Sequence, residues 1–182
     1  LEDALRKGLR SVAIAFLHGA RNHAHELRAA ALAVAAGFEE VVTSHEVAPL
    51  TGLVARADSA VADAYLSPVL LRYVRQFLRE LKQRFGSPDL LLMQSNGGLV
   101  DPDGFRGINS VLSGPAGGVV GMAAVGQASG ASRLVGFDMG GTSTDVSLFA
   151  GELPRRFATE IDGVRLRVPM MDIHTIAAGG GS

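Results

Sequence analysis

The 182-residue chain contains no cysteine, so it can form no disulfide, thiol nucleophile or thiolate metal site. It also lacks an excess of charge of either sign, since 17 basic and 18 acidic residues give a formal net charge of -1. That balance argues against a nucleic-acid partner or an acidic membrane surface. No apolar run approaches the roughly 18 residues of a membrane span. From these absences we expect a cytoplasmic protein with no nucleic-acid or membrane partner.

Hydrophobic residues are plentiful, at 47% of the chain, and a chain of this length can bury a core as one domain or two small lobes. Apolar runs at 12–17 and 41–44 predict two strands, and the residues between them predict a helix from about Asn22 to Gly37. A strand, a helix and a second strand favour parallel pairing. Helical spacing predicts which positions of this helix face the core: Leu27, Ala31, Val34 and Phe38.

The longest helical pattern runs from residue 66 to 85, with apolar residues on one face and basic residues on the other. Ser67 and Pro68 predict a kink or a restart, with Ser67 as the cap and Pro68 as the first residue. We interpret the basic face as solvated. Glu80 lies within it, and no aromatic residues alternate with the arginines as they do on single-strand-binding surfaces.

The most informative segment is residues 136–148, in which a Gly140-Gly141 turn separates two strands. Glycines there allow a positive φ and leave no Cβ in the way, so that successive backbone N–H groups can converge on an anion. Asp138 precedes the turn and Asp145 follows it, and carboxylates beside a phosphate site usually hold Mg²⁺ or its waters. An ordinary type I′ hairpin is the alternative interpretation. Hydroxyl groups follow the glycines: Thr142, Ser143 and Thr144.

Two further segments precede this hairpin. Residues 113–125 predict a helix of small residues that packs closely on a neighbour, with Ser113 as its cap and Pro115 in its first turn. A polar loop over residues 95–104 leaves the carboxyl end of a strand predicted at 90–94, which is where open α/β sheets place ligands. A plain surface loop is the alternative for that segment.

Histidines offer further candidate chemistry. Asp172 and His174 are two residues apart, so on a strand they would point to one face and could share a divalent metal or a proton relay. Two ligands are too few to define a metal site. His18 and His45 each follow a predicted strand, where they face a cleft or satisfy a polar partner. We interpret two other histidines as surface or capping residues: His23 and His25.

Residues 110–150 resemble the hinge helix and second phosphate loop of the superfamily that contains actin, sugar kinases and heat-shock chaperone ATPases. A closer resemblance, over nearly the whole chain, is to the hydantoinase A and 5-oxoprolinase family, which includes ATP-dependent N-methylhydantoinase subunits. Asn22–Glu26 and Asp63–Pro68 resemble family segments more weakly. Four motifs in the family's order carry the resemblance: Met93-Gln94-Ser95-Asn96-Gly97-Gly98, Ser113-Gly114-Pro115-Ala116-Gly117-Gly118, Phe137-Asp138-Met139-Gly140-Gly141-Thr142-Ser143-Thr144-Asp145 and Asp172–Ser182.

The resemblance implies an α/β fold, as a fragment of an actin-like (ribonuclease H-like) ATPase with parts of two lobes. Residues 1–112 would be the closing part of the first lobe and include the long helix. Residues 113–182 would supply the hinge helix and the opening hairpins of the second, phosphate-binding lobe. An Asp162-Gly163 turn predicts a hairpin into a strand at 164–168. Three successive antiparallel strands are expected to open the second lobe: 134–138, 144–149 and 155–161.

The resemblance also implies an ATP-dependent hydrolase that phosphorylates and opens a five-membered cyclic amide. Asp138 and Asp145 would be its catalytic carboxylates, which position Mg²⁺. Asp172 and His174 would hold a second divalent metal or the substrate, and Gly179–Gly181 would approach the nucleotide. Further residues are implied to bind or line the nucleotide site: Gly140, Gly141, Thr142, Ser143, Asn96, Gly97 and Gly114.

The family carries a second glycine-rich phosphate loop that this chain lacks, so we expect the chain to be an excised part of a larger subunit, inactive alone. A second subunit or domain of the hydantoinase B type is the implied partner. Three alternatives remain open. The chain could belong to an ATP-dependent ketone (acetone) carboxylase, to a kinase or chaperone-type ATPase of the same superfamily, or to a non-catalytic interaction module.

Overall fold

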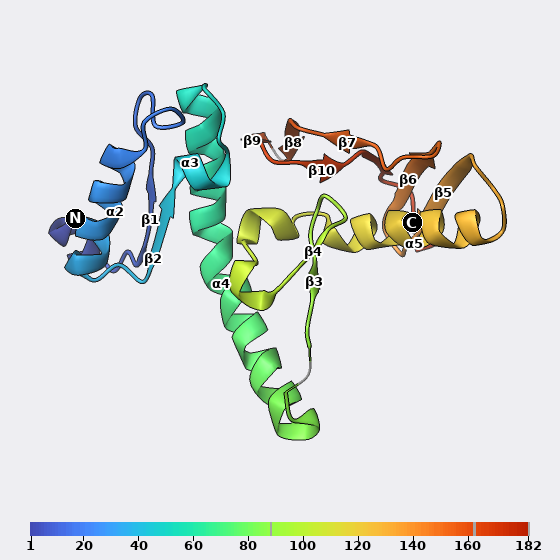
Figure 1. The fold of residues 1–182 in the computed structure, drawn as a ribbon, viewed down its shortest axis with the longest axis horizontal. Coiled ribbons are helices and arrows are strands. Elements are labelled where there is room, and N and C mark those ends of the chain that lie inside the picture. The colour runs from blue at the N-terminus through green and yellow to red at the C-terminus, as the bar shows by residue number, and fades with distance from the viewer. Residues whose placement is uncertain (88, 162, 182) are drawn as a thin grey trace. The chain divides into compact units, whose positions relative to one another are not determined.

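Figure 1 shows the computed structural model of the chain, which describes residues 1–87, 89–161 and 163–181. The chain divides into two compact units. The first unit comprises residues 1–90, 106–108 and 158–168, and the second unit comprises residues 91–105, 109–157 and 169–182. No helix among the described residues combines the length and the apolar character needed to cross a membrane. A lobe boundary between residues 112 and 113 stays a prediction.

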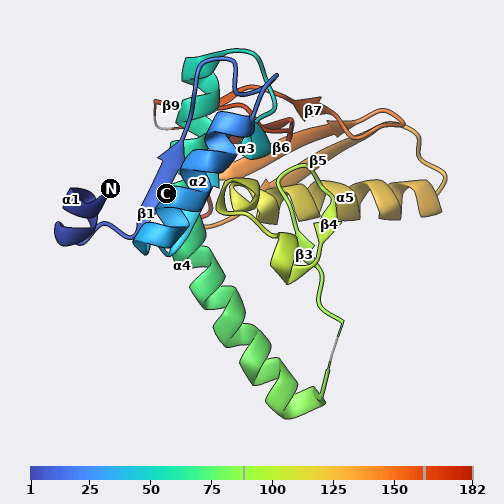
Figure 2. The same ribbon diagram turned by 60° about the vertical axis from the view of Figure 1, so that its left-hand side comes forward.

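The first unit is built around a parallel pair of strands. β1 and β2 pair from Ser11 opposite Glu40 to Ile14 opposite Thr43, and α2 packs beside them (Figure 2). The predicted parallel strand-helix-strand unit is confirmed. The elements of this unit are α1 (Glu2–Arg6), β1 (Ser11–Ile14), α2 (Ala24–Ala36), β2 (Glu40–Thr43), α3 (Ser44–Val47), α4 (Leu53–Phe85), β8 (Thr159–Ile161) and β9 (Val164–Leu166).

α2 turns a different side to the core from the predicted one. Leu27 and Val34 are 46% and 61% exposed, and Ala31 is exposed too, so the prediction for these three is wrong. Alanines contact the core instead, because their small side chains let the helix lie close to the strands. The helix ends as predicted at Gly37, which has a φ of 104°. The core cluster comprises Ile14, Ala33 and Phe38, with Ala29 and Ala30 packed against it.

α4 continues through Pro68, so the predicted restart with Ser67 as its cap is wrong, and the alternative of a kink at Pro68 stays a prediction. Proline has no N–H to bond the carbonyl of the residue four positions earlier, which here is Ala64. Ser11 supplies the missing donor, since its Oγ donates to the Ala64 carbonyl oxygen. The Ser67 hydroxyl donates instead to Asp63 Oδ1 at 2.9 Å. A hydroxyl from β1 therefore explains why the helix accepts a proline in its interior.

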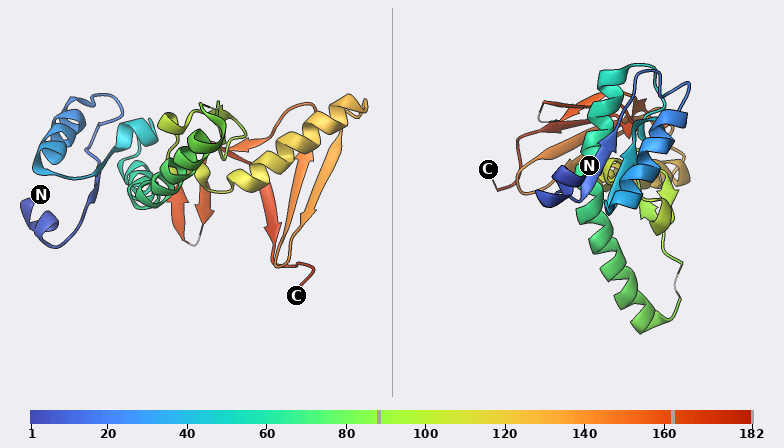
Figure 3. Two further views of the ribbon diagram at one scale, coloured as in Figure 1. Left: turned by 90° about the horizontal axis from the view of Figure 1, so that it is seen from below. Right: turned by 90° about the vertical axis from the view of Figure 1, so that its left-hand side faces the viewer.

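The second unit centres on an antiparallel sheet in the strand order β11-β6-β5, and α5 runs along one face of this sheet (Figure 3). Its core combines Ala116 and Val119 of α5 with Met171, and Ile173 packs against them. The elements are β3 (Leu92–Met93), β4 (Leu99–Val100), α5 (Ser113–Ala128), β5 (Leu134–Met139), β6 (Thr144–Phe149), β7 (Arg155–Arg156), β10 (Met170–Met171) and β11 (Ile173–Ile176), with a 3₁₀ turn at Pro102–Gly104. A second 3₁₀ turn, Gly107–Ser110, has its first two residues in the first unit and its last two in the second.

The third strand of this sheet is not the predicted one. β5 and β6 pair antiparallel as predicted, but the strand expected at 155–161 is divided between β7, which pairs with β10, and β8, which pairs with β9. β11 takes the place beside β6, because that position brings Ile173 into the core under α5. The hairpin predicted after residue 161 is present, since Ile161 lies opposite Val164. Asp162 of the predicted turn lies outside the described residues.

Candidate functional site

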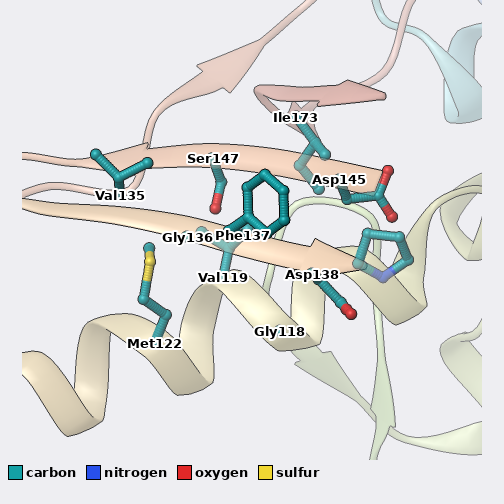
Figure 4. A pocket seen from close by; sticks show the side chains of 11 residues that line it. Gly118, Val119, Met122, Val135, Gly136, Phe137, Asp138, Asp145, Ser147 and Ile173 are labelled. Carbon is teal, nitrogen blue, oxygen red and sulfur yellow. The ribbon is translucent and has the colours of Figure 1, made fainter. Parts of the chain in front are cut away.

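Asp138 and Asp145 lie directly opposite each other on β5 and β6. Residues opposite each other on neighbouring strands project from the same face of a sheet, so both carboxylates face the same side. They line a cavity of about 380 Å³ together with Gly118 of α5, Gly136 and Ser147. In Figure 4 the Asp138 side chain points from β5 toward α5 at Gly118. The structure thus brings together the two acids that the sequence predicted on either side of the turn.

The two carboxylates are only partly engaged by the protein. Asp145 Oδ1 accepts a hydrogen bond of 2.7 Å from Thr175 Oγ1. Within the described part of the chain, Asp138 has no hydrogen-bond or ion-pair partner, and its side chain is exposed. Like charges directly opposite each other on two strands repel. A divalent cation bound through carboxylates and water would relieve that repulsion, so the donor set fits Mg²⁺.

In the glycine turn between these strands, some backbone N–H groups have an acceptor among the described residues and others do not. The Gly140 N–H donates to the Ser143 carbonyl at 2.9 Å and closes the turn. The described residues supply no acceptor for the N–H groups of Gly141 and Thr142. Neighbouring N–H groups without a protein acceptor suit an anion such as phosphate. Ser143 is half-buried in the same turn.

The segment after β11 lies against this turn. Gly180 and Gly181 donate their N–H groups to the carbonyls of Gly140 and Gly141, at 3.0 and 2.8 Å. Gly179 lies so close that a Cβ on it would overlap the Thr142 nitrogen and the Gly141 carbonyl. Glycine is therefore required at 179 for packing on the turn. The expectation that this segment also approaches a nucleotide stays a prediction.

α5 packs as closely on the sheet as its small residues predict. A Cβ on Gly126 would overlap the side chain of Leu134. On the strand side, a Cβ on Gly136 would overlap Ser147 and the Met122 sulfur. The predicted cap is wrong, because Ser113 is the first helical residue and Leu112 occupies the N-cap position. Leu112 has a φ of 59° there, and its apolar side chain forms no capping hydrogen bond. Gly114 is exposed in the first turn.

The loop that carries Asn96 and Gly97 is braced from several sides. Asn96 Oδ1 accepts a hydrogen bond of 2.7 Å from the Gly98 N–H, and Arg155 Nε donates to the Asn96 carbonyl at 2.9 Å. Gly97 has a φ of 80°, and a Cβ there would overlap the end of the Met171 side chain. The cavity beside Asp138 is lined by other residues. A role for Asn96 and Gly97 at a nucleotide stays a prediction.

Asp172 and His174 have separate surroundings. The Asp172 carboxylate forms an ion pair with Arg156 Nε, and Asp172 lies just before β11. His174 is exposed on β11, opposite Val146. The described residues include no group of three or more histidines and acids placed to hold a metal. The role of this pair in binding a second metal therefore stays a prediction.

Sequence reasoning missed a buried polar cluster in the first unit. Glu26 is 0% exposed, and its carboxylate accepts hydrogen bonds from the Phe16 N–H (2.9 Å), Ser44 Oγ (2.6 Å) and the His45 N–H (3.0 Å). It also contacts His45 Nδ1 at 2.7 Å. Burial alone would raise the pKa of Glu26, but the hydrogen bonds from Ser44, Phe16 and His45 outweigh it and lower that pKa to about 2.

Arg56 completes the cluster. It is 0% exposed and donates through Nε to Ser44 Oγ at 2.7 Å and through Nη1 to the Leu50 carbonyl at 2.8 Å. Its Nη2 lies 4.0 Å from Glu26 Oε1. A signal in the sequence was available, because Glu26 shares a helical face with the alanines that pack in the core. The Glu26 carboxylate orients the His45 ring through Nδ1. That ring stacks on the ring of the exposed His23, with the two ring centroids 4.8 Å apart.

Comparisons of the sequence with known proteins show which family the chain belongs to. The family model described as hydantoinase/oxoprolinase matches residues 56–182. The chain belongs to the hydantoinase/oxoprolinase family. It is 42% identical to the 5-oxoprolinase of Dictyostelium discoideum, over 97% of this chain and 15% of that protein. It is 37% identical to the caprolactamase subunit alpha of Pseudomonas jessenii, over 96% of this chain and 26% of that subunit. The predicted family is thus confirmed.

Solved structures share the fold. The crystal structure of the ATP-dependent caprolactamase from Pseudomonas jessenii matches with a TM-score of 0.81 at 35% identity, over 98% of this chain and 26% of that chain. A nucleotide-free acetone carboxylase matches with a TM-score of 0.83 at 23% identity, over 97% of this chain and 26% of that chain, which shows the fold alone. The predicted α/β fold class is confirmed, and the chain spans 15–26% of the length of these relatives.

Proposed function

We propose that this chain is part of an ATP-dependent hydrolase that opens cyclic amides. The observation that carries the proposal is the open carboxylate pair, Asp138 and Asp145, next to a glycine turn in which the described residues supply no acceptor for the N–H groups of Gly141 and Thr142. Relatives named 5-oxoprolinase and caprolactamase, at 42% and 37% identity, support the choice of a cyclic amide. As part of the same proposal the protein acts in the cytoplasm, where ATP is available.

In this function the glycine turn binds the phosphates of ATP. Gly140, Gly141 and Thr142 would do so through backbone N–H groups and a hydroxyl, with Ser143 beside them. Asp138 and Asp145 would hold Mg²⁺ or its waters, and the metal would neutralise charge on the transferred phosphoryl group. Further residues proposed to line the nucleotide site are Asn96, Gly97 and Gly114.

The proposed reaction proceeds in two steps. The amide oxygen of the ring attacks the terminal phosphorus of ATP, the bond to ADP breaks, and a phosphorylated imidate forms. In the second step water adds to the activated carbon, the C–N bond breaks to release the amine and leave an acyl phosphate, and a second water molecule hydrolyses this acyl phosphate to a carboxylate and phosphate. Asp172 and His174 are proposed to hold a second divalent metal or the ring near this carbon. We propose that residues 1–112 belong to one lobe of this ATPase and residues 113–182 to the second, phosphate-binding lobe.

A partner subunit or domain of the hydantoinase B type is part of this proposal. Support comes from the relative named as subunit alpha of a caprolactamase, which implies more than one kind of subunit in that enzyme. A ketone carboxylase remains the alternative with a specific observation behind it, the acetone carboxylase fold at a TM-score of 0.83. In that alternative the ketone enol, rather than a ring amide, would receive the phosphoryl group.

The test is ATP turnover by the protein at its natural full length, together with its partner subunit. Phosphate release is measured with no addition and with 5-oxoproline, hydantoin, ε-caprolactam or acetone plus bicarbonate. The proposal predicts that a cyclic amide stimulates release and is itself converted to the ring-opened product. Stimulation by acetone would favour the carboxylase. ATP hydrolysis that none of these compounds stimulates would favour a kinase or chaperone-type ATPase. An absence of ATP binding would favour a non-catalytic module.

A further inference from the structure

Thr175 occupies a distinctive position in the sheet. On β11 it lies opposite Asp145 of β6, and Asp145 in turn lies opposite Asp138 of β5. The three residues therefore form one row across three neighbouring strands. Because residues in such a row share a face of the sheet, the hydroxyl and both carboxylates project to the same side.

The Thr175 hydroxyl has a defined partner within this row. Its Oγ1 donates to Asp145 Oδ1 at 2.7 Å, a length typical of a hydrogen bond from a hydroxyl to a carboxylate. This bond occupies one carboxylate oxygen of Asp145 and fixes the direction of the other. No described residue does the same for Asp138. The hydrogen bond thus acts on one of the two acids that line the cavity.

We propose that Thr175 is a positioning residue, which holds the Asp145 carboxylate in place for a Mg²⁺-nucleotide complex at the Asp138–Asp145 pair. This inference rests on the proposed function. Two carboxylates opposite each other repel, so an unrestrained Asp145 would rotate away from Asp138 when no cation is present. The hydroxyl opposes that rotation and keeps the free oxygen ready for the metal or its waters.

The surrounding contacts hold Thr175 itself in register. Ile176 lies opposite Thr144, and Thr144 Oγ1 donates to the Ala178 carbonyl at 2.6 Å. β6 is therefore joined to the segment after β11 at the residue next to Asp145. This second link ties the two strands together independently of the Thr175 hydroxyl. Removal of that hydroxyl should leave the strand pairing intact while it frees the Asp145 side chain.

The experiment compares Thr175→Val with Thr175→Ser in the full-length protein. Valine has nearly the shape of threonine without the hydroxyl, and serine keeps the hydroxyl without the methyl group. The affinity for a fluorescent methylanthraniloyl-ATP is measured in excess Mg²⁺ and again in EDTA. Thr159→Val is the matched control, since Thr159 is another strand threonine and belongs to the first unit.

We expect Thr175→Val to weaken Mg²⁺-dependent nucleotide binding about 10- to 100-fold, as is typical when a hydrogen bond to a metal-binding carboxylate is lost. Binding in EDTA should change less than about twofold, and Thr175→Ser and Thr159→Val should behave like the wild type. Equal losses with and without Mg²⁺, or no loss, would overturn the inference. If the wild type binds no nucleotide even with Mg²⁺, the proposed function fails as well, so the two failures are distinguishable.

Discussion

The buried Glu26 of the first unit and the Asp138–Asp145 pair of the second unit differ in how their carboxylate oxygens are bound. In the first unit the Glu26 carboxylate is buried and receives hydrogen bonds from three other residues, with the guanidinium of Arg56 nearby. In the second unit Asp138 is exposed, and Asp145 receives a bond from Thr175 alone among the described residues. A carboxylate whose oxygens are filled by its own chain stabilises a fold. Two carboxylates that face each other with oxygens to spare are suited to a ligand.

The largest expected effect comes from breaking the buried cluster. Glu26→Gln keeps the shape of the side chain but removes its charge, so Arg56 stays buried without a counter-charge. We expect the free energy of unfolding to fall by about 3–5 kcal/mol. Urea denaturation, monitored by circular dichroism, measures this free energy. Glu39→Gln is the control, since that acid is exposed and should change stability by less than about 0.5 kcal/mol. Equal stability of the two variants would show that Glu26 is not structural.

The stability that Glu26 contributes should also depend on pH. The pKa of Glu26 falls from 4.5 to about 2 in the folded protein, so its contribution is complete above pH 4.5. As the pH falls from 4.5 toward 2, the unfolded state takes up the proton first and up to about 3 kcal/mol of stability is lost. Subtracting the pH profile of Glu26→Gln from that of the wild type isolates this residue. A difference that stays constant between pH 5 and 2.5 would contradict the lowered pKa.

A smaller effect is expected at the glycine turn. Gly179→Ala would place a Cβ on the Thr142 nitrogen and force the turn to move, at a cost of about 1–3 kcal/mol. We expect a lower melting temperature and weaker binding of Mg²⁺-ATP. Gly121→Ala is the matched control, because a Cβ there meets open space and alanine favours a helix. If the two variants had equal nucleotide affinity, the packing of Gly179 on the turn would have no functional role.

The smallest effect concerns the proline in α4. Ser11→Ala leaves the Ala64 carbonyl without its donor, which should cost about 1 kcal/mol. In the double variant with Pro68→Ala, the new backbone N–H can bond that carbonyl, so the loss from Ser11→Ala should shrink. A double-mutant cycle by urea denaturation measures this coupling. Strictly additive effects would mean that Ser11 does not compensate for the proline.

Local patterns predicted the parts of the fold that neighbouring residues determine. The β5–β6 hairpin, the parallel pairing of β1 with β2 and the C-cap at Gly37 all follow from turn chemistry and apolar spacing. The facing carboxylates Asp138 and Asp145 followed from the hairpin, because its turn fixes the register. The pair was therefore the most predictable part of the candidate site.

Contacts between distant residues were not predictable in this way. The choice of β11 rather than residues 155–161 as the third strand depends on where Ile173 packs, which no local pattern contains. Burial of Glu26 depends on donors 18 and 19 residues further along the chain. Thr175 was missed for the same reason, since its partner Asp145 lies 30 residues earlier.

The most direct test of the central claim is the Mg²⁺ dependence of ATP binding by Asp138→Asn in the full-length protein. Asparagine keeps the size of the side chain and removes the charge that faces Asp145. If the pair holds a Mg²⁺-nucleotide complex, affinity in excess Mg²⁺ should fall by about 10- to 100-fold toward the value measured in EDTA, while the melting temperature stays near that of the wild type. Unchanged Mg²⁺-dependent binding would contradict the account and leave the glycine turn as an ordinary hairpin.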